Sequence, residues 1–178
     1  MSLHESFTAL AGPDGPVESL ADGYREAFAR LRADPAMHEP LYPGVLDFLA
    51  AMRARDDVRL GIATGKSRRG VAHLVERHGW DRLFATIQTS DDAPSKPHPA
   101  MLVQAMAETG AEPARTVMIG DSTYDMMMAR GAHVGAVGVA WGYHPPDGLQ
   151  AAGADTIVPS CAALADHIAS RFPTLREP

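Results

Sequence analysis

Cysteine is nearly absent from this sequence. Cys161 is the single one, so no disulfide can form within the chain, and a lone thiol suits a reducing compartment. No apolar run approaches the roughly 18 residues of a membrane helix, and no basic-then-apolar signal opens the chain. Lys and Arg number 16 against 22 Asp and Glu, a formal net charge of −6 that disfavours nucleic acid and membranes as partners. The 178 residues, 46% of them apolar, predict a cytoplasmic protein with one main domain.

The order of apolar patterns predicts two parts. From about residue 43 onward, apolar runs of strand length alternate with helical patterns, which is typical of βαβ units and a parallel sheet. The expected strands are 58–63, 84–89, 116–120, 134–140 and 155–158, and the expected helices of this part are 43–53, 67–78, 99–109, 123–132 and 162–171, with a turn at 145–147. Before them, residues 19–31 form an amphipathic helical pattern without a strand. We expect a helical part at 1–40 and an α/β core at 41–178.

Polar side chains follow three of the predicted strands, at the point where each strand ends. In an open parallel sheet, ligands bind beyond the carboxyl ends of the strands. Thr64, Gly65 and Lys66 follow the first strand, Lys96 follows the second, and Asp121 and Asp125 follow the third. One rim of the sheet would then hold a hydroxyl, an ammonium and two carboxylates, which suits a phosphate ester and a divalent cation.

Thr64 and Lys96 each have two interpretations. The Thr64 hydroxyl and the amides after it could hold phosphate oxygens at a helix N-terminus, or Thr64 could belong to an ordinary turn into the helix that Ser67 caps. Lys96 could face the same phosphate or be a solvated loop lysine. Their common position at strand ends favours the ligand.

Asp121 and Asp125 are four residues apart across a strand-to-helix transition, so both carboxylates can face the strand end. Two acids there predict a magnesium site, because Mg²⁺ prefers hard oxygen ligands. The alternative is that Asp121 caps the helix and Asp125 complements its dipole. The three methionines at 126–128 are interpreted as helix packing, because magnesium avoids thioethers.

Two other groups of residues carry less information. The histidines contain no HExxH run and have no matching cysteine set, so a zinc site is not expected. Residues Trp141, Gly142, Tyr143 and His144 follow the fourth predicted strand. They could form a wall of the site or pack as an ordinary loop.

In order, the segments Gly61-Ile-Ala-Thr64-Gly-Lys, Ser95-Lys96-Pro97 and Met118-Ile-Gly-Asp121-Ser-Thr-Tyr-Asp125 resemble motifs two, three and four of the haloacid dehalogenase superfamily. The likeness covers residues 40–170. The stretches Leu41-Tyr-Pro-Gly, Lys96-Pro-His-Pro and Val139-Ala-Trp-Gly-Tyr-His are similar to the phosphoglycolate phosphatase branch, which carries a helical cap. The resemblance implies a Rossmann-like three-layer parallel sheet and a small phosphorylated metabolite as substrate.

The resemblance also implies roles for these residues. Thr64, with Gly65 and Lys66 beside it, would bind the transferring phosphoryl group, and Lys96 would offset its charge. Asp121 would ligate Mg²⁺ and Asp125 would support the metal.

The family's nucleophile is expected to be an Asp in an hhhDxDGT motif at the end of a first, central strand, and this motif is not in the sequence. The nearest run, from Asp14 to Ser19, follows no strand and has Gly12 where the first Asp should stand. We therefore expect a core without its central first strand, a remnant of a helical cap at 1–40, and a fragment of a longer protein. Without the nucleophile, the aspartyl-phosphate route has no first step in this chain.

Several functions remain open from the sequence. The first is a Mg²⁺-dependent phosphatase acting on a phosphoglycolate-like monoester, with its nucleophile outside this chain. The second is an inactive phosphate-binding or interaction module. A phospho-receiver domain is disfavoured because it would place its acids before Thr64 and Lys96. Dehalogenation gives no reason for two acids, because it needs no metal, and phosphomutase chemistry would use the same site.

Overall fold

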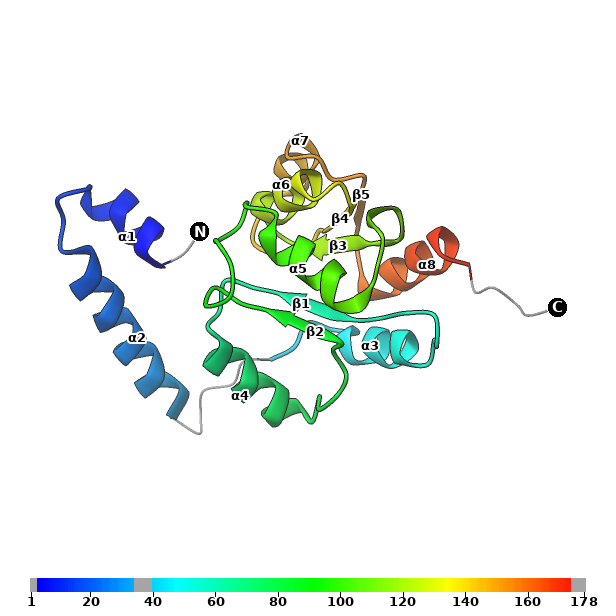
Figure 1. Cartoon of the computed structure of the whole chain (residues 1–178), viewed down its shortest axis with the longest axis horizontal. Coiled ribbons are helices and arrows are strands. Elements are labelled where there is room, and N and C mark those ends of the chain that lie inside the picture. Colours follow the sequence, from blue (N-terminus) through cyan, green and yellow to red (C-terminus); the bar gives the residue numbers. More distant parts are fainter. Residues whose placement is uncertain (1–2, 34–39, 174–178) are drawn as a thin grey trace. The chain divides into compact units, whose positions relative to one another are not determined.

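The computed structural model describes residues 3–33 and 40–173, and the chain divides into two compact units, Met1–Tyr42 and Pro43–Pro178 (Figure 1). The first unit contains helices α1 (Leu3–Ala11) and α2 (Val17–Ala33), joined by a turn in which Gly12 has a φ of 80°. Phe7 packs edge-on against Tyr24, with ring centroids 6.2 Å apart. The helix predicted at 19–31 is therefore confirmed within α2.

The second unit alternates strands and helices. Its elements are α3 (Val45–Arg53), β1 (Gly61–Ala63), α4 (Arg68–His78), β2 (Thr86–Gln88), α5 (Ala100–Thr109), the 3₁₀ turn η1 (Pro113–Arg115), β3 (Val117–Gly120), α6 (Thr123–Gly131), β4 (Gly135–Val139), α7 (Pro146–Ala151), β5 (Thr156–Val158) and α8 (Cys161–Arg171). Each predicted strand and helix of this unit is present within a few residues of its expected ends. The exception is α7, because a turn was expected at 145–147 and the structure has the start of a helix there. Pro146 occupies the first helical turn, where a backbone N–H has no partner within the helix.

All strand pairs among the described residues are parallel, as predicted, but they form two separate sheets. β1 pairs with β2, with Gly61 opposite Thr86. The other sheet has the order β3, β4, β5, with Ile119 opposite Val137 and Val137 opposite Thr156. Within the part of the chain that the structure describes, β1 and β3 each have one strand neighbour only.

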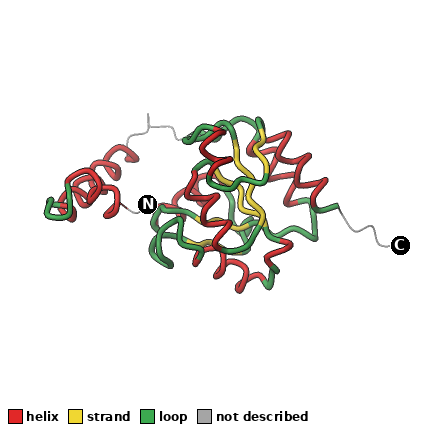
Figure 2. Tube along the Cα trace, turned by 90° about the horizontal axis from the view of Figure 1, so that it is seen from above, coloured by secondary structure: helices red, strands yellow, loops and turns green. Residues whose placement is uncertain are grey.

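The core has one hydrophobic cluster on each face of β4, which is buried along its whole length. Ala136 contributes to the cluster that contains Met101 of α5, Met128 of α6 and Leu149 of α7. Val137 and Val139 contribute to the other cluster, which contains Met52 of α3 and Leu164 and Ile168 of α8. Successive strand residues point to opposite faces, so the helices form two layers with the strands between them (Figure 2). This is the Rossmann-like three-layer architecture.

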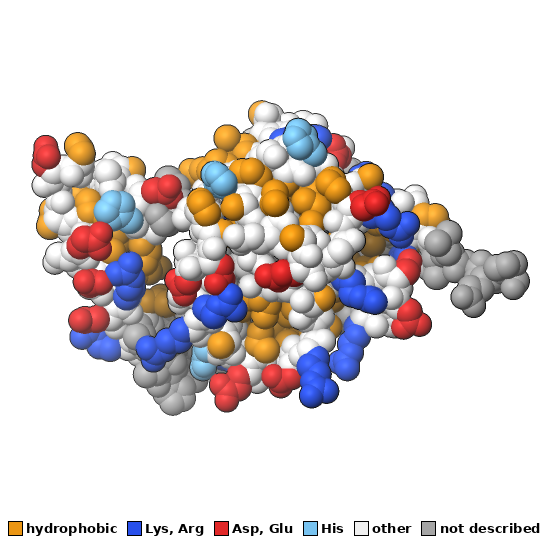
Figure 3. Space-filling model, viewed as in Figure 1, with side chains coloured by type: hydrophobic (Ala, Val, Ile, Leu, Met, Phe, Trp, Pro, Cys, Tyr) orange, Lys and Arg blue, Asp and Glu red, His pale blue; other side chains and the backbone are white. Residues whose placement is uncertain are grey.

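Charged side chains of both signs are interspersed over the face of the molecule drawn in Figure 3. Among the described residues, none of the helices combines the length and the apolar character that a membrane crossing requires.

Candidate functional site

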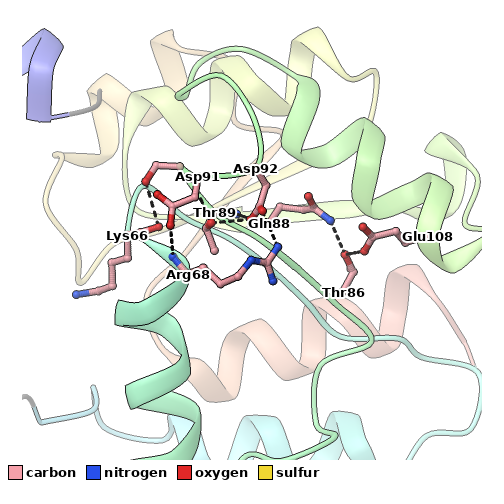
Figure 4. Close-up of polar contacts among 9 residues, drawn as sticks. Lys66, Arg68, Thr86, Gln88, Thr89, Asp91, Asp92 and Glu108 are labelled. Atoms are coloured by element: carbon pink, nitrogen blue, oxygen red, sulfur yellow. Dashed lines mark hydrogen bonds and ion pairs between the residues drawn. The ribbon is translucent and has the colours of Figure 1, made fainter.

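The loops that follow β1 and β2 are bound to each other (Figure 4). The Thr64 N–H donates to the Gln88 carbonyl at 3.0 Å, which continues the pairing of β1 with β2 by one residue. Two residues further along the chain, the Lys66 carbonyl accepts from the Ser90 N–H at 3.2 Å and from the Ser90 hydroxyl at 3.3 Å. The Thr64 hydroxyl accepts from the Lys66 N–H at 3.2 Å. The Thr64-to-Lys66 turn is thus fixed at the carboxyl ends of two strands.

Helix α4 begins at a double cap. The Ser67 hydroxyl accepts from the Gly70 N–H, as predicted, and the Asp91 carboxylate accepts from the Arg68 N–H at 2.8 Å. The Arg68 guanidinium also pairs with Asp92 at 2.6 Å (Figure 4). Because Asp91 occupies this first amide, a phosphate at this rim would be held by the turn at 64–66 rather than by the Arg68 amide.

Asp92 has its own set of donors. Its Oδ2 accepts from the N–H and the hydroxyl of Thr89, at 2.9 and 2.6 Å. The bond from the Thr89 hydroxyl, then the bond from Arg68, and then the bond from the Thr89 N–H hold the pKa of Asp92 below its usual range. The carboxylate is therefore an anion that braces the β2 loop, a role that the sequence did not reveal.

Lys96 and Asp125 form a partly buried ion pair. Nζ of Lys96 lies 2.6 Å from Oδ1 of Asp125, and their side chains are 16% and 5% exposed. Oδ2 of the same carboxylate accepts from the Ser122 N–H at 3.1 Å and from the Ser122 hydroxyl at 2.7 Å. Ser122 Oγ in turn accepts from the Asp125 N–H, which completes a capping box at the start of α6.

The pairing answers two questions that the sequence left open. Lys96 is not a solvated loop lysine, because an acid in the first turn of α6 binds its ammonium group. Asp125 does complement the N-terminus of α6, as the alternative interpretation held, but Ser122 rather than Asp121 is the cap. Gly120 allows this approach, since a side chain at this position would overlap the Asp125 carboxylate.

Asp121 is held by the loop after β4. Its Oδ2 accepts from the Tyr143 N–H at 3.0 Å, and its carbonyl accepts from the His144 N–H at 3.1 Å. A side chain on Gly142 would overlap the Asp121 carboxylate. The segment 141–144 therefore positions Asp121 through its backbone, and the sequence signal for this was the glycine between two aromatic residues after a strand.

The remainder of this segment packs against its surroundings. Nδ1 of His144 accepts from the Thr123 N–H at 3.1 Å, at the first turn of α6. Trp141 packs against the hydrophobic cluster that contains Val137 and Val139, whereas Tyr143 is 87% exposed.

The donors present fit a magnesium ion in part. Asp121 offers a carboxylate at the strand end, and no hydrogen bond described in the structure engages its Oδ1. Asp125 has both oxygens committed to Lys96 and Ser122, so it would support the ion indirectly. Among residues 3–33 and 40–173, no group of three or more His, Cys, Asp or Glu side chains forms a metal cluster. Water and a phosphate ester would have to supply most of the octahedron.

A three-layer parallel α/β unit with a hydroxyl turn, a partly buried lysine and a loop-held aspartate at its strand ends has the Rossmann-like architecture, in which ligands bind at this edge of the sheet. The family model described as haloacid dehalogenase-like hydrolase matches residues 8–133. The chain belongs to this family, as the resemblance of its motifs indicated.

Individual relatives agree with this placement. The chain is 36% identical over 167 residues to a phosphoglycolate phosphatase of Chromobacterium violaceum, covering 92% of this chain and 72% of the relative. It is 35% identical over 118 residues to the pyrophosphatase PpaX of Oceanobacillus iheyensis, covering 66% and 55%. A hydrolase of Pseudomonas syringae shares the fold, with a TM-score of 0.80 at 24% identity over 96% of this chain and 78% of that one.

The chain is shorter than these relatives. It spans between 51% and 72% of the length of eight curated relatives that it matches, among them phosphoglycolate phosphatases from several bacteria.

Proposed function

We propose that this chain carries the phosphate-binding and metal-binding part of a Mg²⁺-dependent phosphatase that hydrolyses a small, phosphoglycolate-like phosphate monoester. The observation that carries the proposal is the rim formed by the Thr64 turn, the partly buried Lys96 and the loop-held Asp121 at the ends of parallel strands. The similarity to a phosphoglycolate phosphatase supports the class of substrate.

Each residue of the rim has a distinct task in this proposal. The Thr64 hydroxyl and the amides of Gly65 and Lys66 would donate to the phosphoryl oxygens. Lys96, oriented by Oδ1 of Asp125, would offset the negative charge of the phosphoryl group as the ester bond breaks. Its low exposure strengthens this interaction, because water screens a buried charge less.

Asp121 would hold the magnesium ion, and the backbone of Tyr143 and His144 would keep its carboxylate in place. When bound, the ion would polarise a phosphoryl oxygen as a Lewis acid. The Asp125 side chain would act at one remove, by fixing Lys96 and the start of α6.

The covalent step needs an aspartate from outside these residues, because the sequence has no Asp-X-Asp-Gly-Thr run. Its carboxylate oxygen would attack phosphorus as the ester P–O bond breaks, and the alkoxide would take a proton from water and leave as the alcohol. Water would then attack the phosphorus of the aspartyl-phosphate and release inorganic phosphate and the free carboxylate. The same absence favours a second candidate function, a module that binds phosphate without cleaving it.

The test compares phosphate release from 2-phosphoglycolate by the 178-residue chain and by a form extended with the codons upstream of Met1. We expect turnover from the extended form alone, lost with EDTA and in Asp121→Asn but kept in Asp166→Asn, which alters an exposed acid of α8. Unchanged rates in EDTA would refute the magnesium proposal. Turnover by the 178-residue chain would refute the external nucleophile, and phosphate binding without turnover by either form would establish the second candidate.

A further inference from the structure

The turn after β1 and the loop after β2 are joined at three points. On the turn, these points are the Thr64 N–H, the Lys66 carbonyl and Arg68, which are spaced two residues apart. Their partners follow one another along the loop, and they are Gln88, Ser90, Asp91 and Asp92. Figure 4 shows the contacts of Lys66 and Arg68. The contact between the two strands therefore continues beyond their ends and includes the turn at 64–66.

The loop at 89–92 is closed by its own hydrogen bonds. The Thr89 hydroxyl donates to Oδ2 of Asp92 at 2.6 Å and accepts from the Asp91 N–H at 3.2 Å. The Thr89 N–H donates to the same oxygen of Asp92, and the Asp92 N–H donates to the Thr89 carbonyl at 3.1 Å. Because Thr89 is fully buried, these bonds fix the loop to the core. The Asp92 carboxylate is the acceptor on which this closure depends.

The other oxygen of Asp92 binds a different element. Oδ1 accepts from the Arg68 guanidinium at 2.6 Å, and Arg68 is the first residue of α4. A hydrogen bond between two charged groups is roughly twice as strong as one between neutral groups. One carboxylate therefore joins the buried end of β2 to the start of α4.

These links fix both ends of the segment at 64–68. Thr64 is held by the strand pairing, and Arg68 is held by the two acids of the loop. Gly65 and Lys66 lie between these ends, and their N–H groups are the ones that we assign to the phosphate. Ordering a free loop around a ligand costs conformational entropy, and a site that is ordered beforehand avoids this cost.

We propose that Asp92, paired with Arg68, is a positioning residue, which holds the loop at 89–92 against the turn at 64–66 and so orders this turn for a phosphoryl group. The inference rests on the proposed function, since it takes this turn as the phosphate site. Asp92 acts through the loop and not on the ligand, because its two oxygens are bound by Thr89 and Arg68.

A second ion pair of the same unit provides a matched control. Asp155 accepts from the Arg130 guanidinium at 2.6 Å and from the Ala136 N–H at 2.8 Å, so it also joins a guanidinium to a backbone amide. It precedes β5 and lies at the amino ends of the strands, at the opposite edge of the sheet from the turn at 64–66. Asp92→Asn and Asp155→Asn should therefore lower the urea midpoint of unfolding by similar amounts, and only Asp92→Asn should affect the turn.

The test is a calorimetric titration of the 178-residue chain with inorganic phosphate in the presence of Mg²⁺. Asp92→Asn leaves an oxygen for Thr89 but removes the charge that binds Arg68. Arg68→Met breaks the pair from a side chain that is 61% exposed and leaves the bonds of Thr89 in place. We expect each change to weaken phosphate binding about tenfold or more, the double variant to bind no more weakly than the single ones, and Asp155→Asn to keep the full affinity.

The outcomes separate this inference from the proposed function. Equal losses of affinity in Asp92→Asn and Asp155→Asn would show a general effect on folding and would overturn the positioning role. Full affinity in Asp92→Asn and in Arg68→Met would overturn that role alone. Absence of binding to the unaltered chain would refute the proposed function and this inference with it.

A second measurement does not depend on phosphate binding. The Ser90 N–H donates to the Lys66 carbonyl at 3.2 Å, so hydrogen exchange at this amide reports directly on the contact between the loop and the turn. In the ligand-free chain, Asp92→Asn should speed this exchange about tenfold, and Asp155→Asn should not change it. An unchanged exchange rate in Asp92→Asn would contradict the positioning role even if phosphate binds.

Discussion

The Lys96–Asp125 pair gives a prediction that can be worked through from the structure. In Asp125→Ala, the Lys96 ammonium loses the acid that lies 2.6 Å away, although its side chain stays only 16% exposed. The Ser122 N–H and hydroxyl lose their acceptor at the same time, so the start of α6 loses half of its capping box.

Removing one partner of a buried ion pair costs about 3–5 kcal/mol of the free energy of unfolding, because the other charge is left uncompensated. With a urea m-value of about 2 kcal/mol per molar, the unfolding midpoint should fall by roughly 1.5–2.5 M. In Lys96→Met, Asp125 retains its bonds from Ser122. Because each single change already removes the ion pair, the double variant Lys96→Met/Asp125→Ala should be less destabilised than the sum of the two single changes by about 1–3 kcal/mol.

The assay is urea unfolding followed by tryptophan fluorescence, because Trp80 and Trp141 both lie in the unit from Pro43 to Pro178. Asp166→Asn, at an exposed position of α8, serves as the control and should change stability by less than about 0.5 kcal/mol. A loss below about 1 kcal/mol in Asp125→Ala, or additive effects of the two single changes, would refute the reasoning that the pair is buried and coupled.

Three further predictions concern other parts of the same unit. Asp155→Ala should lower the free energy of unfolding by about 1–2 kcal/mol at pH 7, because the Asp155 carboxylate accepts from the buried N–H of Ala136 in β4. That bond, and after it the bond from Arg130, lowers the pKa of Asp155. The stabilisation by the Asp155 carboxylate is present above its unfolded pKa of about 3.9 and is lost as the pH falls through its lower folded pKa. The urea midpoints of the unaltered protein and Asp155→Ala should therefore converge in strong acid. A difference between these midpoints that stays constant with pH would count against this prediction. Burial raises the pKa of the Cys161 thiol, so a thiol reagent should label it at least tenfold more slowly in the folded than in the urea-unfolded protein at pH 8, and equal rates would disprove its burial. Gly142→Ala should lower the free energy of unfolding by about 1–3 kcal/mol, because its methyl group would overlap Asp121. The control Gly148→Ala, with only ordinary contacts in α7, should be neutral or slightly stabilising. Equal urea midpoints for the two variants would contradict the close approach of Gly142 to Asp121.

The sequence predicted the layers of the fold because local chemistry and tertiary packing agree in this chain. Ser67 caps α4 as expected, and the apolar runs became parallel strands in the predicted order. β1 starts later than predicted, and β2 starts later and ends earlier. Helix α7 was missed because two prolines and a glycine are typical of a turn, whereas Pro146 occupies a helical first turn.

The site was predictable in its members but not in its connections. Strand-end positions identified Thr64, Lys96 and Asp121, since parallel strands bring their carboxyl ends together. Spacing alone could not show that Asp125 would be committed to Lys96 and Ser122, because that depends on which loops meet. The backbone support of Asp121 by the 141–144 segment also joins residues far apart in the sequence, and Gly142 between two aromatic residues was its only sequence signal.

The most direct test of the central claim is a calorimetric titration of the 178-residue chain with inorganic phosphate in the presence of Mg²⁺. The rim of Thr64, Lys96 and Asp121 predicts saturable binding that weakens at least tenfold in Thr64→Val and in Asp121→Asn and is unchanged in Asp166→Asn. Binding of equal strength in all four proteins, or no binding to the unaltered chain, would contradict a phosphate site at the carboxyl ends of β1 and β3.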